Sequence, residues 1–274
     1  MGFAVISLDK AVHMIESKTD FSNSVVLTID DGWEGVGKIA WPLLKQYGFD
    51  WTLYLTTYYA EKQTQVMNIA IQYLCWKTSK KEIDLSLFAE IFKHKNEFQG
   101  LKSISILEKE LQKIGTMFST SEERQNFLSI VASAFGLNQD DIEKKRLFYL
   151  LDMATIKKMH NDGVDIELHT HRHSIGGEDK NKLNLEIAEN KKSIQKVCDH
   201  KLKHFCYPSG LYTQKHLGWL EELGVVSATT CRPGLNYHTT RLLELGRFLD
   251  GENISDIEFE AELSGFSELL RKLK

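Results

Sequence analysis

Three histidines within five residues are the feature of this sequence best suited to chemistry. The segment reads His169-Thr170-His171-Arg172-His173. If it forms one helical turn, the imidazoles of His169 and His173 lie on the same face and can share a metal ion, whereas His171 points away. The alternative is a solvated polar turn with ordinary histidines, and the cluster alone does not decide between the two.

A pair of adjacent aspartates, Asp30 and Asp31, offers the carboxylate that two histidine ligands would need. Two histidines and one carboxylate leave positions open for water and substrate, as a hydrolytic zinc site requires. Asp31 is the candidate ligand, and because neighbouring residues of a strand diverge, Asp30 would lie near the bound water. The alternative is that Asp31-Gly32 is a simple turn and that Asp30 is an N-cap.

Alternating strands and helices must position these residues. Short β-branched or aromatic runs alternate with helical patterns, which predicts βα units around a parallel sheet or barrel. We expect strands at residues 24–29, 51–56, 164–168, 203–207 and 225–229, and helices at 35–47, 153–162, 183–199 and 213–223. The charged residues of the last but one helix, Glu186 and Glu189 among them, predict a solvated helix face.

Polar residues follow four of the expected strands. The aspartate pair follows one, the histidine segment follows another, Pro208-Ser209-Gly210 follows a third, and a loop that contains Arg232 follows the fourth. Because βα architectures build their sites at the carboxyl ends of parallel strands, we expect the four clusters to converge on one mouth.

The βα alternation disappears between about residues 60 and 150. Apolar residues there recur at three-to-four spacing, notably in residues 101–118 and 121–135, which predicts helices. We therefore expect one domain over residues 1–274, with a helical insertion of about 60–150 that forms a small subdomain over one end of the sheet.

The composition excludes several classes of protein. The chain has 274 residues, of which 42% are hydrophobic, and its formal net charge is -4. This apolar content can bury a core, which excludes the disordered, collagen-like and disulfide-scaffold classes. The small negative charge supplies no global cationic field, so we expect no nucleic-acid partner. Protein partners cannot be named from the sequence.

Cysteine usage and the amino-terminal residues bear on the compartment. None of the four cysteines forms a CxxC pair; most are expected to be buried thiols in a reducing compartment, with two disulfide pairs as the alternative. No apolar window approaches the length of a membrane span. We expect a cytoplasmic protein as the sequence stands, or a secreted or periplasmic one if an amino-terminal segment was removed.

Three motifs in this order and strand context carry a family resemblance: LTIDDG, HTHRH and YPSG. The sequence resembles the polysaccharide deacetylases, the NodB-homology or carbohydrate esterase family 4 enzymes, in the branch whose third motif reads like FAYPxG. The likeness covers about residues 24–59 and 147–236. It implies a distorted (β/α) barrel with fewer than eight strands, and residues 60–150 would then be an insertion in a single catalytic domain.

The resemblance also implies roles for the motif residues. Asp31, His169 and His173 would hold a divalent metal, usually zinc, and Asp30 would be the general base. Thr170 would brace the histidine segment. Within the loop Pro208-Ser209-Gly210, which would line the acetyl pocket, the backbone N–H of Ser209 would face the oxyanion.

Aromatic residues beside the motifs are candidates for sugar contact. Trp33, Tyr207 and Tyr212 could stack on sugar faces in an open groove, although packing in the core or at the rim is the more frequent role of such rings.

Three family features are absent. One is the Asp/Trp motif that usually braces the supporting arginine, where this sequence reads TTCRPGLN. The arginine that usually supports the base is replaced by Cys206, and the late histidine that supplies a general acid is replaced by Arg247 in ELGRFL. We expect Arg232 to bind substrate and to compensate electrostatically for the missing arginine, and His238 is a distant candidate acid.

The residues and the resemblance together predict a metal-dependent hydrolase that removes N-acetyl groups from an N-acetylated sugar in a bacterial glycan or glycan precursor. One alternative is a related C–N hydrolase, a deformylase or cyclic amidase. Another is a catalytically silent carbohydrate-binding relative, which the two missing family residues suggest. An open metal site argues against the silent relative, because a binding module gains little from one.

Overall fold

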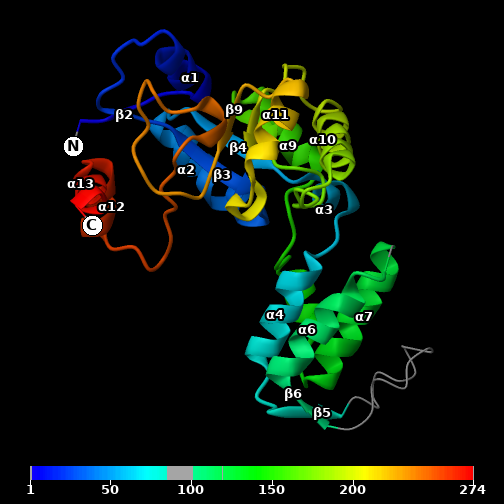
Figure 1. Ribbon diagram of the computed structural model, residues 1–274. Coiled ribbons are helices and arrows are strands. Elements are labelled where there is room, and N and C mark those ends of the chain that lie inside the picture. Colours follow the sequence, from blue (N-terminus) through cyan, green and yellow to red (C-terminus); the bar gives the residue numbers. More distant parts are fainter. Residues whose placement is uncertain (1, 85–100, 119, 274) are drawn as a thin grey trace. The chain divides into compact units, whose positions relative to one another are not determined.

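The computed structural model describes residues 2–84, 101–118 and 120–273, shown in Figure 1. The chain divides into two compact units. The first comprises the residues up to Tyr58 together with those from Met153 onward, and the second is Tyr59–Asp152. Each unit is described by itself below.

A curled, parallel, five-stranded half-barrel sheet forms the centre of the first unit. Its strand order is β3-β4-β7-β8-β9, and all neighbouring strands are parallel. The predicted α/β class with fewer than eight strands is therefore confirmed. The strands are β3 (Leu27–Asp31), β4 (Trp51–Leu55), β7 (Asp165–Leu168), β8 (His204–Cys206) and β9 (Ser227–Thr229).

The expected helices between these strands are present, with shifted ends. Figure 1 shows α9, α10 and α11 on the opposite side of the sheet from α1. The segment after β3 begins as a π-helix, η1 (Val36–Ala40), before it continues as an α-helix that ends at Gly48 in a left-handed conformation. The α-helices are α2 (Trp41–Tyr47), α9 (Met153–Asn161), α10 (Lys180–Ile194) and α11 (Gln214–Glu222).

Elements at both ends of the chain complete the first unit. Helix α1 (Leu8–Glu16) packs its apolar residues against Tyr54, Cys206 and Leu245, which covers the sheet face that carries Tyr54. The other elements are β1 (Ala4–Val5), which pairs in parallel with β2 (Ser24–Val25), the short turns η2 (Pro208–Gly210) and η3 (Leu242–Glu244), α12 (Asp256–Leu263) and α13 (Phe266–Leu273).

The second unit is mostly helical, and it also contains a small antiparallel sheet. Residues 101–103, which were expected to be helical, form a strand that pairs with β5. The prediction that this unit lies over one end of the parallel sheet stays a prediction. The elements are α3 (Thr57–Lys62), which runs across the unit boundary, α4 (Met67–Lys77), β5 (Glu82–Asp84), β6 (Leu101–Ser103), α6 (Ile104–Gly115), α7 (Ser121–Ala134) and α8 (Gln139–Lys144).

All four cysteines are free thiols, which excludes the two disulfide pairs that the sequence had left open. Cys75, Cys198 and Cys206 are buried and Cys231 is partly exposed. In the described part of the chain, every helix is too short or too polar to cross a bilayer.

Candidate active site

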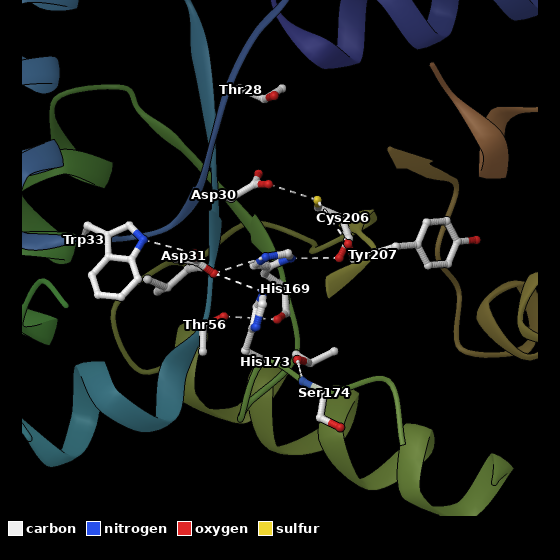
Figure 2. Close-up of polar contacts among 12 residues, drawn as sticks. Thr28, Asp30, Asp31, Trp33, Thr56, His169, His173, Ser174, Cys206 and Tyr207 are labelled. Atoms are coloured by element: carbon white, nitrogen blue, oxygen red, sulfur yellow. Dashed lines mark hydrogen bonds and ion pairs between the residues drawn. The ribbon is translucent and has the colours of Figure 1, made fainter. Parts of the chain in front are cut away.

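The carboxyl ends of the parallel strands bring the expected site residues together, as Figure 2 shows. Asp31 ends β3, the histidine segment follows β7, and the Pro208 loop follows β8. Only β4 separates β7 from β3 in the sheet. The aspartates and histidines therefore meet at the carboxyl ends of these strands.

Asp31, His169 and His173 converge on a common point. The Nε2 atoms of His169 and His173 lie 3.3 Å and 3.4 Å from the same oxygen, Oδ1 of Asp31. The other oxygen of Asp31 accepts a hydrogen bond of 3.0 Å from Nε1 of Trp33. One carboxylate oxygen is thus fixed by the indole and the other faces both imidazoles.

The histidine segment reaches this arrangement without a helical turn, so the predicted turn is wrong. Residues 169–173 form an irregular loop in which Thr170 and His173 have left-handed conformations, with φ of 63° and 55°. Asp31 and Ser209 share this feature, with φ of 66° and 56°. Non-glycine residues rarely adopt such conformations, and strain of this kind concentrates at functional sites.

Buried hydrogen bonds hold the histidine loop in place. The His169 N–H donates to Oδ1 of Asn190 at 3.0 Å, and the Asn190 amide donates to the carbonyl of Leu55 at 2.9 Å. Thr56 donates to the carbonyl of His169 at 3.2 Å, and Oγ1 of Thr170 accepts from the N–H of Ser174 at 3.0 Å. The geometry at Thr170 suits the bracing role that the resemblance implies.

The expected solvated face of α10 instead anchors this loop, which corrects the prediction for Glu186 and Glu189. Glu186 is buried and accepts from the Arg172 N–H at 2.7 Å and from Nη1 of Arg172 at 2.9 Å. Glu189 also pairs with Arg172. His171 contacts both this helix and α3: its Nε2 lies 4.0 Å from Oε2 of Glu189, and its Nδ1 lies 2.8 Å from Oγ1 of Thr57.

A hydrogen bond to the backbone orients the imidazole of His169. Its Nδ1–H donates to the carbonyl of Cys206 at 2.8 Å, which leaves Nε2 directed toward Asp31. Metal-ligating histidines typically make such a bond.

The two imidazoles differ in their proton affinity. Burial alone would lower the pKa of His169, but Cys206, Asp31 and Asp30 outweigh burial, and this pKa is raised well above its usual value. For His173, burial lowers the pKa and outweighs the attraction of Asp31. Negative surroundings therefore favour one positive charge in the cluster.

Asp30 has a counter-ion that the sequence interpretation did not assign to it. Both guanidinium nitrogens of Arg247 donate to Asp30, Nη1 to Oδ1 and Nη2 to Oδ2, each at 2.6 Å. Burial raises the pKa of Asp30, but the hydrogen bonds and charge of Arg247, with the charge of His169, lower it further than burial raises it. Arg247 occupies the supporting role that was expected of Arg232.

The arginine also explains why a cysteine is accommodated next to Asp30. The Cys206 thiol donates to Oδ2 of Asp30 at 3.4 Å, and Nη2 of Arg247 lies 3.3 Å from the Cys206 sulfur. A second bond runs from Nη1 of Arg247 to Oγ1 of Thr28 at 3.2 Å. The guanidinium of Arg247 thus binds two residues of β3, Thr28 and Asp30, and also contacts Cys206.

The expected substrate-contacting residues after β8 separate into buried and exposed ones. Tyr207 is fully buried, and its hydroxyl donates to the carbonyl of Leu243 at 3.0 Å. Its predicted sugar contact is therefore wrong. Pro208 is buried, Gly210 is partly exposed and Ser209 is exposed. A Cβ on Gly210 would lie 2.7 Å from Cβ of Cys231, so this position in the loop requires glycine.

Arg232 lies beside this loop without reaching Asp30. Its Nη2 lies 3.3 Å from Oε1 of Glu244, and its guanidinium lies 5.3 Å from the ring centre of Tyr212. Tyr212 stacks on Tyr207, with ring centres 4.4 Å apart. The expectation that Arg232 compensates for the missing arginine is therefore wrong. Trp33, which was expected to contact sugar, is partly exposed while it holds Asp31.

His238 lies apart from the aspartates. It packs edge-on against Phe21, with ring centres 4.8 Å apart, and in the part of the chain that the structure describes it makes no contact with Asp30 or Asp31. The proposal of His238 as the acid gains no geometric support.

The donor set at Asp31, His169 and His173 fits a divalent metal ion. Their ligand atoms lie within 4.8 Å of one another, and two imidazole nitrogens with one carboxylate oxygen suit zinc and similar ions. The shared orientation toward Oδ1 of Asp31 leaves the remaining coordination positions to water and substrate.

A family model supports the same conclusion from the sequence. The model described as polysaccharide deacetylase matches residues 106–228, a segment that contains the histidine loop and the Pro208 loop. Over this segment the chain is similar to the polysaccharide deacetylase family. The matched segment does not include Asp30 or Asp31, which the fold brings to the histidines.

Solved structures of deacetylases share this fold. The Streptococcus pyogenes deacetylase PplD, in complex with acetate, has a TM-score of 0.59 and 15% identity, over 96% of this chain and 80% of that chain. IcaB from Ammonifex degensii has a TM-score of 0.58 and 15% identity, over 96% and 82%.

A de-N-acetylase from Aggregatibacter actinomycetemcomitans has a TM-score of 0.57 and 14% identity, over 95% of this chain and 83% of that chain. At these identities the likeness establishes the fold alone. No curated protein is similar enough in sequence to count as a match.

Three functional positions were missed by sequence interpretation. Arg247 was noted only as a replacement for a histidine, Asn190 was not singled out, and Glu186 was assigned to solvent. Arg247 and Asp30 are separated by 217 positions, and Asn190 and Leu55 by 135, whereas Arg172 lies 14 positions before Glu186. A polar residue in an otherwise apolar helix stripe was the available signal for Asn190, which lies three residues after the apolar Ile187.

Proposed function

We propose that this protein is a metal-dependent N-deacetylase, with zinc as its metal, that acts on an N-acetylated sugar in a glycan or glycan precursor. The family already supports an enzyme that acts on an acetylated sugar. The finer proposal rests on one observation: a carboxylate held by an arginine lies next to a cluster of two imidazoles and one carboxylate oxygen.

Asp31, His169 and His173 would hold the ion. When bound there, a divalent ion lowers the pKa of a bound water and polarises the acetamido carbonyl. Trp33 keeps one oxygen of Asp31 occupied, and the carbonyl of Cys206 keeps the His169 ring in the ligating tautomer. These contacts set the orientation of the cluster before substrate arrives.

Asp30 would accept the proton of the attacking water. Arg247 holds both of its oxygens at 2.6 Å, which fixes the carboxylate and keeps it ionised. As the C–N bond breaks, the protonated Asp30 would return the proton to the leaving amine. A carboxyl group whose pKa is lowered is a ready proton donor, and this role removes the need for the late family histidine.

The Pro208 loop would complete the acetyl pocket. Ser209 is exposed at the carboxyl end of β8 and has a left-handed conformation. No hydrogen-bond partner of its N–H is found among the described residues, which leaves this donor available to a developing oxyanion.

Acetate release from N-acetylated oligosaccharides tests the proposal. The wild-type protein loaded with zinc should release acetate, and Asp30→Asn should lose that activity while it retains the metal. The exposed Asp50→Asn is the matched control, and its activity should equal that of the wild type. Equal acetate release by Asp30→Asn and wild type would contradict the role of Asp30.

A further inference from the structure

Two further groups of metal-ligating side chains exist among the described residues. The first, Asp30 with His169 and Cys206, already contains a cation, because the guanidinium of Arg247 binds Asp30 and contacts the cysteine sulfur. The second consists of Asp165, Glu167 and His200. It lies at the amino-terminal part of β7, whereas the catalytic histidines follow the carboxyl end of that strand.

We propose that Asp165, Glu167 and His200 form a second divalent-cation site, separate from the deacetylase centre. Its donors are two carboxylate oxygens and one imidazole nitrogen, a set that suits a borderline transition metal such as Zn²⁺ or Mn²⁺. The ion would be structural and would join β7 to the segment that leads into β8.

The distances between ligand atoms suit a shared ion. Nε2 of His200 lies 3.6 Å from Oδ1 of Asp165 and 4.0 Å from Oε1 of Glu167. Bonds of about 2.0–2.2 Å place neighbouring ligand atoms roughly 3–3.6 Å apart, so small movements suffice. The corresponding distances at Asp31, 3.3 Å and 3.4 Å, are of the same order.

A backbone oxygen stands ready as a further ligand. The carbonyl of Ile166 lies 2.9 Å from Nε2 of His200. In the absence of an ion, the His200 N–H donates to this carbonyl. With an ion bound, Nε2 would supply its lone pair instead, and the carbonyl would lie close enough to coordinate the same ion.

His200 is the one basic side chain that faces both carboxylates among the described residues. Glu167 is buried, with 1% of its surface exposed, and among the described residues no lysine ammonium or arginine guanidinium group forms an ion pair with Glu167 or Asp165. The nearby ammonium groups are engaged elsewhere: Lys203 with Asp9 at 2.5 Å, and Lys191 with the carbonyl of Leu223 at 2.6 Å. Burying carboxylates together is unfavourable unless a cation compensates them.

Neutral hydrogen-bond donors also contact both carboxyl groups. Glu167 accepts hydrogen bonds from the backbone N–H groups of Lys203 and His204, with distances of 3.0–3.2 Å. Asp165 accepts one from Oγ1 of Thr52 at 2.8 Å. These bonds hold the two carboxyl groups in place beside His200.

The position of the cluster explains what an ion would do there. Strands β7 and β8 share a single register pair, Leu168 with Phe205, so their amino-terminal parts are joined through the Glu167 side chain. Asp165 and His200 are half-buried, with 34% and 28% of their side chains exposed, which gives an ion access from solvent. A bound ion would link Asp165 and Glu167 of β7 to His200, which precedes β8.

Zinc stoichiometry tests the second site. We expect about two zinc ions per chain in the wild type and one in His169→Ala/His173→Ala, which isolates the new site. Adding Asp165→Asn and His200→Ala to that variant should remove the remaining ion. Asp199→Asn is the matched control, because it removes a negative charge from an exposed neighbour that is not a ligand, and it should keep the ion.

A thermal measurement on a variant that keeps Asp165, Glu167 and His200 tests the second site even if the Asp165 and His200 variants do not fold. Zn²⁺ added to His169→Ala/His173→Ala should raise its Tm by about 4 °C or more, and a chelator should reverse the change. The proposal is overturned if this variant binds no zinc, or if it keeps its ion after the Asp165 and His200 substitutions. Neither result bears on deacetylation, which the variant has lost for a separate reason.

Discussion

The two adjacent carboxylates of the active site differ in what balances their charge. Asp30 receives both guanidinium nitrogens of Arg247, so the chain itself supplies its cation. Asp31 faces His169 and His173, and its other oxygen is held by the neutral indole of Trp33. The difference is consistent with our proposal that Asp30 is a fixed, ionised group and that a metal ion would bind beside Asp31.

The largest effect is expected from Asp31→Asn. An amide oxygen is a poorer ligand than a carboxylate, so the ion at His169 and His173 should be lost and kcat/KM should fall by at least about 10³-fold. Elemental analysis and acetate release on the same sample check both parts. Full activity of Asp31→Asn in a sample without the ion would contradict the role of Asp31 as a ligand of a catalytic metal.

Asp30→Asn should affect the reaction without removing the metal. Loss of a proton acceptor is expected to lower kcat by about 10²–10⁴-fold, while the ion at Asp31 stays bound. Metal content and kcat measured together separate the two aspartates. If Asp30→Asn lost the ion as completely as Asp31→Asn, the two carboxylates would not have distinct roles.

Arg247→Met should lower kcat by roughly 10–100-fold, since the carboxylate of Asp30 loses its orientation. The pH profile distinguishes this role from a merely structural one. Asp30 acts as a carboxylate, and activity is lost as the pH falls through its pKa. Because Arg247 helps to hold that pKa low, the acidic limb should move to higher pH in the variant.

Arg232→Met is the matched control for this prediction. Arg232 pairs with Glu244 and leaves Asp30 untouched, so the acidic limb should stay where it is in the wild type. Equal shifts in both arginine variants would count against a specific effect of Arg247.

Trp33→Phe should have a smaller effect, about a 10-fold weaker affinity for the metal at Asp31. Phenylalanine keeps the ring but cannot donate to Oδ2 of Asp31. Competition with a chelator measures this affinity. An unchanged affinity would show that the indole N–H does not orient the ligand.

Glu186→Gln should give the smallest change in turnover. The variant weakens the bonds from Arg172 that hold the histidine loop, and we expect a loss of about 1–3 kcal/mol in the free energy of unfolding. Denaturant unfolding checks this value, with kcat within about 3-fold of wild type. A stability equal to that of the wild type would return Glu186 to the solvated face first predicted for it.

The sequence alone was enough to predict those parts of the site that depend on short, continuous stretches of chain. Each strand end is a short apolar run followed by polar residues, so Asp31 and His169 could be placed at strand ends before the structure was known. The sheet class followed from the same alternation of elements. The ligand spacing in the histidine segment was informative although its assumed helical turn was wrong.

The remaining parts depend on contacts that no local pattern encodes. Arg247 lies 217 positions from Asp30, and an arginine after a strand has many alternative partners. Tyr207 follows β8 directly, yet its ring packs inward, because the strand's last residues still alternate between the faces of the sheet. Left-handed conformations at Asp31 and Thr170 could not be predicted, since neither residue is glycine.

A crystal structure of the zinc-loaded protein, with anomalous data collected at the zinc edge, tests the central claim most directly. The account predicts an anomalous peak about 2.0–2.2 Å from Oδ1 of Asp31 and from Nε2 of both His169 and His173. A zinc-containing crystal without a peak among these three atoms would contradict it.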